Sequence, residues 1–155
     1  MAQSNIKIVA VNKKARFNYF IETEYEAGLQ LTGTEVKSLR QGRANLKDSY
    51  CKIHNGEVFV HQMHIGPYPF AHYGNHEPLR RRKLLLHKWE IKKLYGKVNE
   101  KGYALIPLKL YFKHGRAKLG IGLGRGKQKH DKRETIRRRD QEREMARTRR
   151  AYGVK

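Results

Sequence analysis

Residues 120–127 (GIGLGRGK) combine four glycines with a lysine, the composition of a loop that holds a nucleotide phosphate. Such a loop needs a glycine five positions before its last glycine, and a Ser or Thr after the lysine to hold magnesium. Ile121 and Gln128 stand at those two places. The segment is therefore no nucleotide site, and we expect its glycines to let a strand pass close to another backbone or to RNA.

Six histidines lie between residues 54 and 87, and histidine is the commonest metal ligand. They form no His-Glu-x-x-His pattern, and the chain's single cysteine, Cys51, can build neither a disulfide framework nor a Cys-rich zinc site. No Ser or Cys has the sequence context of a nucleophile, and no carboxylate pair stands out. We expect no metal, no cofactor and no enzymatic activity.

The charge of the chain is strongly one-sided. Its 155 residues include 35 Lys and Arg but only 14 Asp and Glu, a formal net charge of +21. This excess favours a polyanionic partner, either a nucleic acid or an anionic membrane surface. No run of about 18 apolar residues is present, and residues 1–16 lack the apolar stretch of a signal peptide. We expect a cytoplasmic protein that binds no membrane.

Aromatic and basic side chains are interleaved in residues 14–19, 88–95 and 109–113. Rings that stack on bases, next to cations that hold phosphates, are how small barrels bind single strands and loops of RNA. The alternative is that many of these rings belong to an ordinary core. We expect RNA rather than DNA as the partner.

The run of four cations at residues 80–83 stands at the predicted start of a long helix. Because the helix dipole favours acids there, a polyanion that compensates these cations is the preferred interpretation. A nuclear-import signal is the competing one, and it ranks lower because the run leads directly into apolar residues 84–86.

The elements that must position these residues are mostly strands. Apolar and aromatic runs predict strands at residues 17–21, 29–31, 50–53, 58–65, 103–112 and 118–123. Gly28 is expected to break the first two, Asn55-Gly56 to form a hairpin turn, and Pro107 to sit at an edge or bulge. Helices are expected at 34–41, ended by Gly42, and at 82–97. The economical architecture is a small, partly open β-barrel with packed helices, a class that includes the oligonucleotide-binding fold.

Residues 127–155 differ from the rest of the chain. They hold six apolar residues, 12 basic and 5 acidic, so they carry +7 and the preceding 126 residues carry +14. Their apolar positions do not form a stripe that could face a core. We expect two parts, a folded domain at 1–126 and a tail at 127–155 that is disordered when free and helical against a polyanion. A solubility tail without further function is the alternative.

Seven motifs stand out along the chain: NKKA at 12–15, EAG at 26–28, GTEVKSLR at 33–40, NHEP at 75–78, RKLLLH at 82–87, PLKLY at 107–111 and HDKR at 130–133. They occur in the order found in the bacterial small protein B family, which binds transfer-messenger RNA (tmRNA). The chain resembles this family from residue 12 to about residue 138. The resemblance implies a mainly β fold, an oligonucleotide-binding type of closed or partly open barrel with two or three flanking helices and a basic tail. It also implies a non-catalytic adaptor in trans-translation, the rescue of stalled ribosomes.

The resemblance places Asn12, Glu26 and Leu85 at positions implicated in tmRNA binding. Asn12 suits an unpaired base edge, and Leu85 packs on a base or anchors the helix. Glu26 accepts from a base amino group or orients a cation such as Lys14. The residues expected to contact tmRNA are Asn12, Lys13, Lys14, Arg16, Glu26, Arg82, Lys83, Leu85, Lys109, Lys118, Arg125 and Lys127.

The resemblance further implies that the barrel holds the tRNA-like domain of tmRNA and replaces the missing anticodon arm. The tail is expected to enter the decoding centre of the 16S rRNA and the empty mRNA channel, and elongation factor Tu is expected to accompany aminoacylated tmRNA. The tail residues expected there are His130, Asp131, Lys132, Arg133, Arg137, Arg138, Arg139, Arg143 and Arg147. A ribosomal or general structural RNA-binding protein is the second hypothesis, and an RNA-processing enzyme is the third.

Overall fold

A ring of strands forms the body of the protein in this computed structural model, which describes residues 5–151. The last four residues of the predicted tail lie outside the described part. The elements are β1 (Ile6–Val11), α1 (Ala15–Asn18), β2 (Tyr19–Leu29), α2 (Gly33–Arg40), β3 (Ala44–Asn45), β4 (Tyr50–His54), β5 (Glu57–His61), β6 (His64–Ile65), β7 (Arg82–Leu85), α3 (Lys88–Val98), β8 (Tyr103–Lys113), β9 (Arg116–Gly126) and α4 (Lys129–Ala151).

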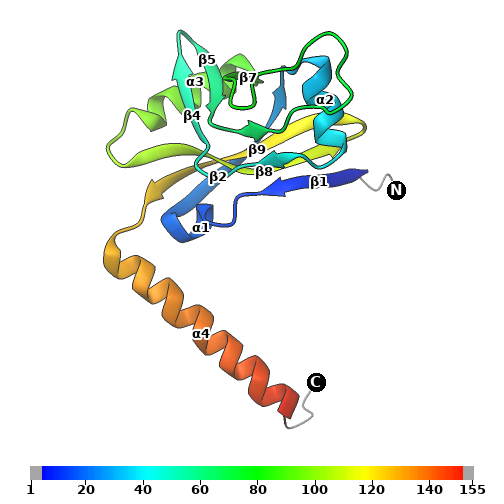
Figure 1. Ribbon diagram of the computed structural model, residues 1–155. Helices are drawn as coiled ribbons and strands as arrows, with labels where there is room; N and C mark the ends of the chain where they lie inside the picture. Colours follow the sequence, from blue (N-terminus) through cyan, green and yellow to red (C-terminus); the bar gives the residue numbers. More distant parts are fainter. Residues whose placement is uncertain (1–4, 152–155) are drawn as a thin grey trace.

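The large sheet is antiparallel and closes on itself. Its order is β1-β8-β4-β5-β7-β2-β9, and β9 also pairs with β8, so six strands form a ring to which β1 is added on the outside of β8. Figure 1 shows α2 and α3 against this ring and α4 extending away from it. The predicted mainly β fold is confirmed, because one antiparallel ring of strands with short flanking helices forms the body of the protein.

The core lies inside the ring. Inward side chains of β4, β5, β7, β8 and β9 pack there with Leu39 of α2 and Leu94 of α3. A smaller cluster of Ala15, Ile106 and Leu108 joins α1 to β8. No side chain of α4 is buried, as its lack of an apolar stripe predicts.

Three predictions from short sequence signals are confirmed: a hairpin turn, a bulge and the end of a helix. Asn55 and Gly56 have φ of 50° and 74° and join β4 to β5. The β8–β9 register shifts between Pro107 and Lys109, which is the predicted bulge at Pro107. Helix α2 ends at Arg40, just before Gly42.

The prediction of a helix over residues 82–97 is wrong in its first half. Residues Arg82–Leu85 form strand β7, which pairs with β5 and β2, and Leu84 is buried inside the ring. Helix α3 begins only at Lys88, where the backbone amide of His87 donates to the carboxylate of Glu90 (3.1 Å). The apolar residues that suggested one helical face therefore belong to two elements, Leu84 to strand β7 and the later ones to helix α3. The cations at 80–83 do not start a helix.

Four other features differ from the prediction. Phe17 belongs to α1, and β2 runs without a break through Gly28 to Leu29. The predicted strand at 58–65 is divided into β5 and β6 at Gln62, whose φ is 60°. Strand β1 was not predicted, although five of its six residues (IKIVAV) are apolar and four of them are β-branched; it pairs with β8.

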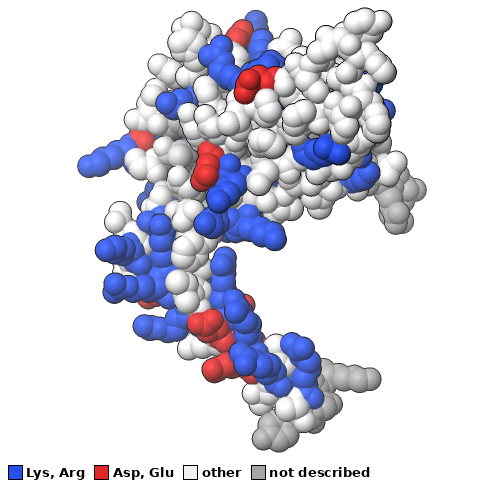
Figure 2. All heavy atoms as spheres, in the orientation of Figure 1, with Lys and Arg blue, Asp and Glu red and all other residues white. Residues whose placement is uncertain are grey.

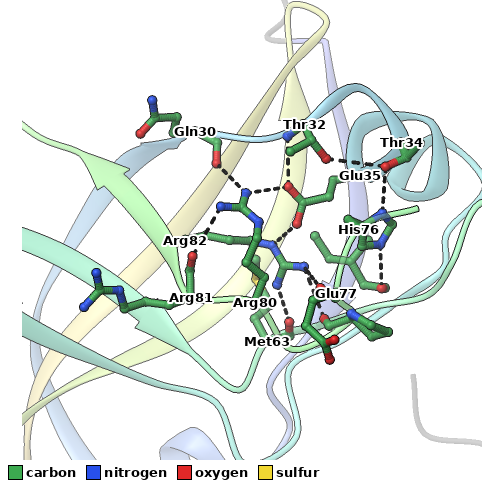
Figure 3. A network of polar contacts seen from close by, with 12 residues as sticks. Gln30, Thr32, Thr34, Glu35, Met63, His76, Glu77, Arg80, Arg81 and Arg82 are labelled. Atoms are coloured by element: carbon green, nitrogen blue, oxygen red, sulfur yellow. Dashed lines mark hydrogen bonds and ion pairs between the residues drawn. The ribbon is translucent and has the colours of Figure 1, made fainter. Parts of the chain in front are cut away.

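One buried acid organises the side of the ring next to α2 (Figure 3). The Glu35 side chain is fully buried and accepts hydrogen bonds from Arg82, Arg80 (2.6 Å) and the backbone amide of Thr32 (2.9 Å). Arg82 is also fully buried and donates to the carbonyl oxygen of Met63. Burial alone raises the pKa of Glu35, but the three donors outweigh it, so its pKa lies below the ordinary value.

Gly122 and Gly124 of β9 are required by close packing, as the sequence suggests. A Cβ on Gly124 would lie 2.6 Å from the carbonyl oxygen of Phe20, and a Cβ on Gly122 would lie 2.9 Å from Ile21 Cγ2. Side chains at these positions would push β2 away from β9, which would open the ring.

Glu35→Gln is expected to lower the free energy of unfolding by about 3–5 kcal/mol, because it leaves the buried Arg82 without a charged partner. Glu57→Gln is the matched control, since Glu57 and Lys83 form an exposed pair (3.2 Å) worth at most about 1 kcal/mol. Urea unfolding at neutral pH measures both, and equal effects would contradict the organising role of Glu35.

The buried pair of Glu35 and Arg82 also predicts that the stability of the protein depends on pH. Because the folded-state pKa of Glu35 is lowered, its stabilisation is complete above the unfolded-state value of about 4.3 and is lost as the pH falls through the folded-state pKa. Glu35→Gln should therefore lose less stability than the wild type on acidification. If the urea midpoints of Glu35→Gln and of the wild type fall equally on acidification, this prediction is wrong.

Gly124→Ala is expected to destabilise the protein by about 1–3 kcal/mol through overpacking against β2. Gly126→Ala serves as the control, since no atom lies within 4 Å of its Cβ position. The difference in urea midpoint between the two variants is the measurement, and similar midpoints would show that β2 can move aside.

Candidate nucleic-acid interface

The turn after β1 forms a ridge between two surface grooves. Asn12 is fixed there because its side-chain amide donates to the carbonyl oxygen of Pro107 and its backbone amide to that of Leu108, both at 2.8 Å. Lys13 and Lys14 beside it are exposed. Asn12 therefore positions the ridge, and its side-chain oxygen accepts no hydrogen bond from another residue between 5 and 151.

The larger groove, of about 970 Å³, lies on one side of this ridge. Tyr50 faces it, with its ring stacked on His61 (5.1 Å between centroids) and the Lys52 ammonium 5.6 Å from its centre. The rings and lysines that line the groove are Tyr19, Tyr50, Tyr95, Tyr103, Lys13, Lys14, Lys47 and Lys52. Aromatic rings beside cations suit unpaired bases and their phosphates.

The smaller groove, of about 510 Å³, holds the predicted acid Glu26. The Tyr111 hydroxyl donates to its carboxylate (2.5 Å), and the Lys113 ammonium lies 3.4 Å away. These contacts hold the pKa of Glu26 below its ordinary value, the Tyr111 bond being the strongest cause. The cation beside Glu26 is therefore Lys113, and the prediction of Lys14 in that place is wrong.

Strand register brings predicted residues from four strands onto one outer face of the ring. Lys109 pairs with Gly120, which pairs with Glu26, and in the next row Lys118 and Leu85 both pair with Gly28. Partners in register point to the same side of a sheet. Leu85 is about half exposed (52%) and lies over Gly28, where a Cβ would be 3.2 Å from Leu85 Cβ.

Arg125 and Lys127 lie at the other end of β9, where α4 leaves the ring. Arg125 pairs with Glu22 (3.4 Å), and the Lys127 ammonium lies 4.9 Å from the centre of the Phe20 ring. They are therefore apart from Leu85 and belong to the junction with the tail. Arg16, exposed on α1, forms an ion pair with Glu24.

The tail residues lie along α4. Figure 2 shows Lys and Arg side chains gathered on this helix and at its junction with the ring. Lys132 and Arg139 contact α1, with their charged groups 5.9 and 5.8 Å from the centre of the Phe17 ring, and Arg139 also lines the smaller groove. His130 lies 3.3 Å from Asp131. The exposed remainder comprises Arg133, Arg137, Arg138, Arg143 and Arg147.

The run at 80–83 is largely neutralised within the protein. Arg82 has no exposed surface, so its predicted contact with RNA is wrong for this fold. Arg80 shares the carboxylate of Glu35, Lys83 pairs with Glu57, and Arg81 lies over the Phe59 ring (4.2 Å). The interpretation that a polyanion compensates these cations loses its basis, because the run does not start a helix and Glu35 and Glu57 pair with three of its four members.

Sequence reasoning placed Tyr111 and Lys113 within an interleaved aromatic and basic run that favours RNA, but it listed neither of them, nor Tyr50, among the individual contact residues. The alternation of Lys109, Tyr111 and Lys113 along β8 is the signal that could have placed the first two on the face of Glu26. Tyr50 had no comparable signal, because its groove is formed by segments distant in the sequence.

Two further features bear on what the protein can do. Within residues 5–151 no helix has the length and apolar character needed to cross a membrane. In the same part of the chain, no three His, Cys, Asp or Glu residues come together as metal ligands. The histidines instead take part in local contacts such as the Tyr50–His61 stack.

The fold and its grooves define a basic protein with the surface of a nucleic-acid-binding protein. A family model described as SmpB protein matches residues 9–151. The SsrA-binding protein of Geobacter sulfurreducens is 57% identical over 140 residues, 90% of this chain and 92% of that protein. That of Geobacillus thermodenitrificans is 56% identical over 147 residues, 95% of each. The chain belongs to the SmpB protein family.

A solved structure is also similar. Its chain, from work described as "tmRNA-SmpB: a journey to the center of the bacterial ribosome", has a TM-score of 0.66 and 46% sequence identity, and the match covers 83% of this chain and 94% of that one.

Tyr111→Phe is expected to raise the pKa of Glu26 toward its ordinary value, because it removes the strongest hydrogen bond to the carboxylate. Tyr103→Phe is the matched control, since it removes a hydroxyl that donates to Glu22 (3.0 Å) and not to Glu26. Carboxyl NMR titration of labelled glutamate measures the pKa of Glu26 in both variants, and only Tyr111→Phe should change it. A Glu26 pKa that stays low in Tyr111→Phe would assign the shift to Lys113 and Lys118 instead.

Proposed function

We propose that this protein is a non-catalytic adaptor that binds the tRNA-like domain of tmRNA and brings it to stalled ribosomes in trans-translation. The observation that carries the proposal is membership of the SmpB protein family, whose relatives are named SsrA-binding proteins. The two grooves and their ridge supply a surface of the right chemistry. A cytoplasmic location follows from the ribosomal partner.

Residues 1–126 are proposed to hold tmRNA. Lys13, Lys14, Lys109 and Lys118 would contact phosphates, because they project from the ridge and the outer face. Asn12 would meet an unpaired base with the groups that Pro107 leaves free. Glu26, kept ionised by Tyr111 and Lys113, would accept from a base amino group, and Leu85 would pack on a base. Arg16 and Arg125 are supporting cations.

Residues 127–155 are proposed to act on the ribosome while the ring replaces the missing anticodon arm. Free of RNA the tail would lack a stable helix in solution, because α4 has no buried side chain to hold it. On the ribosome the His130 ring would stack on a base of the 16S decoding centre and Lys132 and Arg133 would hold phosphates. The arginines that follow would line the empty mRNA channel, with elongation factor Tu accompanying the aminoacylated tmRNA.

Removing the tail after Gly126 is expected to leave tmRNA affinity within about fivefold of the full chain, since the ring loses few contacts, chiefly those of Lys127 with Phe20, of Lys132 and Arg139 with Phe17, and of Arg139 with the smaller groove. Peptide tagging on stalled ribosomes should be abolished. Filter binding with purified tmRNA and a reconstituted tagging assay measure the two properties separately. Equal loss of both would refute this division between ring and tail.

The matched control keeps the tail and alters the ridge. Lys13→Gln/Lys14→Gln in the full chain should weaken tmRNA binding and lower the log–log salt slope by about 1.4–1.8, with folding unaffected because both side chains are exposed. A general RNA binder would lose affinity for bulk tRNA and tmRNA alike. The adaptor should keep its preference for tmRNA as the salt concentration rises.

A further inference from the structure

The segment between β6 and β7, residues 66–81, is a loop with a firmly held base. The His76 ring bridges the Thr34 hydroxyl and the carbonyl oxygen of Ile65, both at 2.9 Å, and the Ile65 amide donates to the carbonyl oxygen of Pro78 (3.0 Å). The buried Arg82 guanidinium donates to the carbonyl oxygens of Glu77 and Pro78. Figure 3 shows these contacts joining the loop to α2 and to the ring.

The tip of this loop is closed by a side chain. The Asn75 amide accepts from the backbone amide of Tyr68 (3.0 Å) and donates to its carbonyl oxygen (2.9 Å). Phe70 packs edge to face on the half-buried Tyr68 ring, yet 66% of it is exposed, and Tyr73 is fully exposed. Two large rings presented to solvent on a pinned loop mark an interaction surface.

Cations stand beside Tyr68 and at the base of this loop. The Lys37 ammonium lies 5.5 Å from the centre of the Tyr68 ring, and Arg40 follows one turn later on α2. Arg43 lies at the base of the loop, where its carbonyl oxygen accepts from the Gly66 amide (2.8 Å). All three cations are exposed, and the loop itself adds one exposed acid, Glu77. An apolar protein partner would leave the cations unpaired, whereas RNA offers bases for the rings and phosphates for the cations.

We propose that Phe70 and Tyr73 stack on unpaired bases of tmRNA while Lys37, Arg40 and Arg43 contact its phosphates. The inference rests on the proposed function and adds a contact outside the two grooves. Two observations favour tmRNA over ribosomal RNA as the occupant. The loop leads directly into β7, which presents Leu85 on the face assigned to tmRNA. Figure 1 places the loop beside α2, on the far side of the ring from α4, which is assigned to the ribosome.

The test compares Phe70→Ala/Tyr73→Ala with Phe70→Tyr/Tyr73→Phe in the full chain. Loss of stacking should weaken tmRNA binding roughly five- to hundredfold per ring, while the conservative variant stays within about twofold. Leu79→Ala is the control for an exposed apolar side chain in the same segment (43% exposed), and its affinity should be unchanged. Because the altered rings are exposed, the urea midpoint should stay that of the wild type.

Salt dependence separates stacking from charge. The double alanine variant should keep the wild-type log–log slope, whereas Lys37→Gln should reduce it by about 0.7–0.9. A photo-crosslinking residue at position 73 should label tmRNA in ribosome-bound complexes. Crosslinks only to ribosomal RNA or to protein, or wild-type affinity of the double alanine variant, would overturn the inference. A wild-type protein that fails to bind tmRNA would instead refute the proposed function.

Discussion

The buried carboxylate of Glu35 is the contact on which the arrangement around α2 depends. It caps α2 through the Thr32 amide, neutralises Arg82 inside the ring and accepts from Arg80 at the surface. Arg82 in turn holds the carbonyl oxygens of residues 63, 77 and 78, so one acid orients a helix, a strand and the base of a loop. A buried ion pair is a weak source of stability compared with apolar packing, and its value here lies in fixing these parts relative to one another.

The few acids of this basic chain divide its cations into two groups. One group forms ion pairs within the protein: Arg82 with Glu35, Lys83 with Glu57 and Arg125 with Glu22. The lysines of the ridge, by contrast, have no acidic partner among the described residues. The net charge of the chain therefore overstates how many cations are available to bind a polyanion. The cations that remain lie in the grooves, next to the loop at 66–81 and along α4, and several of them stand beside aromatic rings, so charge and stacking are offered together.

Closure of the ring is what assembles the proposed tmRNA surface. Lys109, Glu26 and Leu85 come from strands far apart in the sequence and share a face only because β8, β9, β2 and β7 are neighbours. The glycines of β9 permit this approach, since side chains at 122 and 124 would collide with β2. Helix α4 adds nothing to the core, so the ring and the tail can serve different RNA surfaces.

The sequence by itself determined those features that depend on local chemistry. The Asn55-Gly56 turn, the bulge at Pro107, the end of α2 and the family all follow from short segments. Tertiary structure alone decided the role of Arg82, because a cation in a basic run is buried only if an acid 47 positions away, Glu35, meets it there. It likewise decided that residues 82–85 are a strand and that Lys113 faces Glu26. Pairing between distant strands sets these contacts, and no short window of sequence contains both partners.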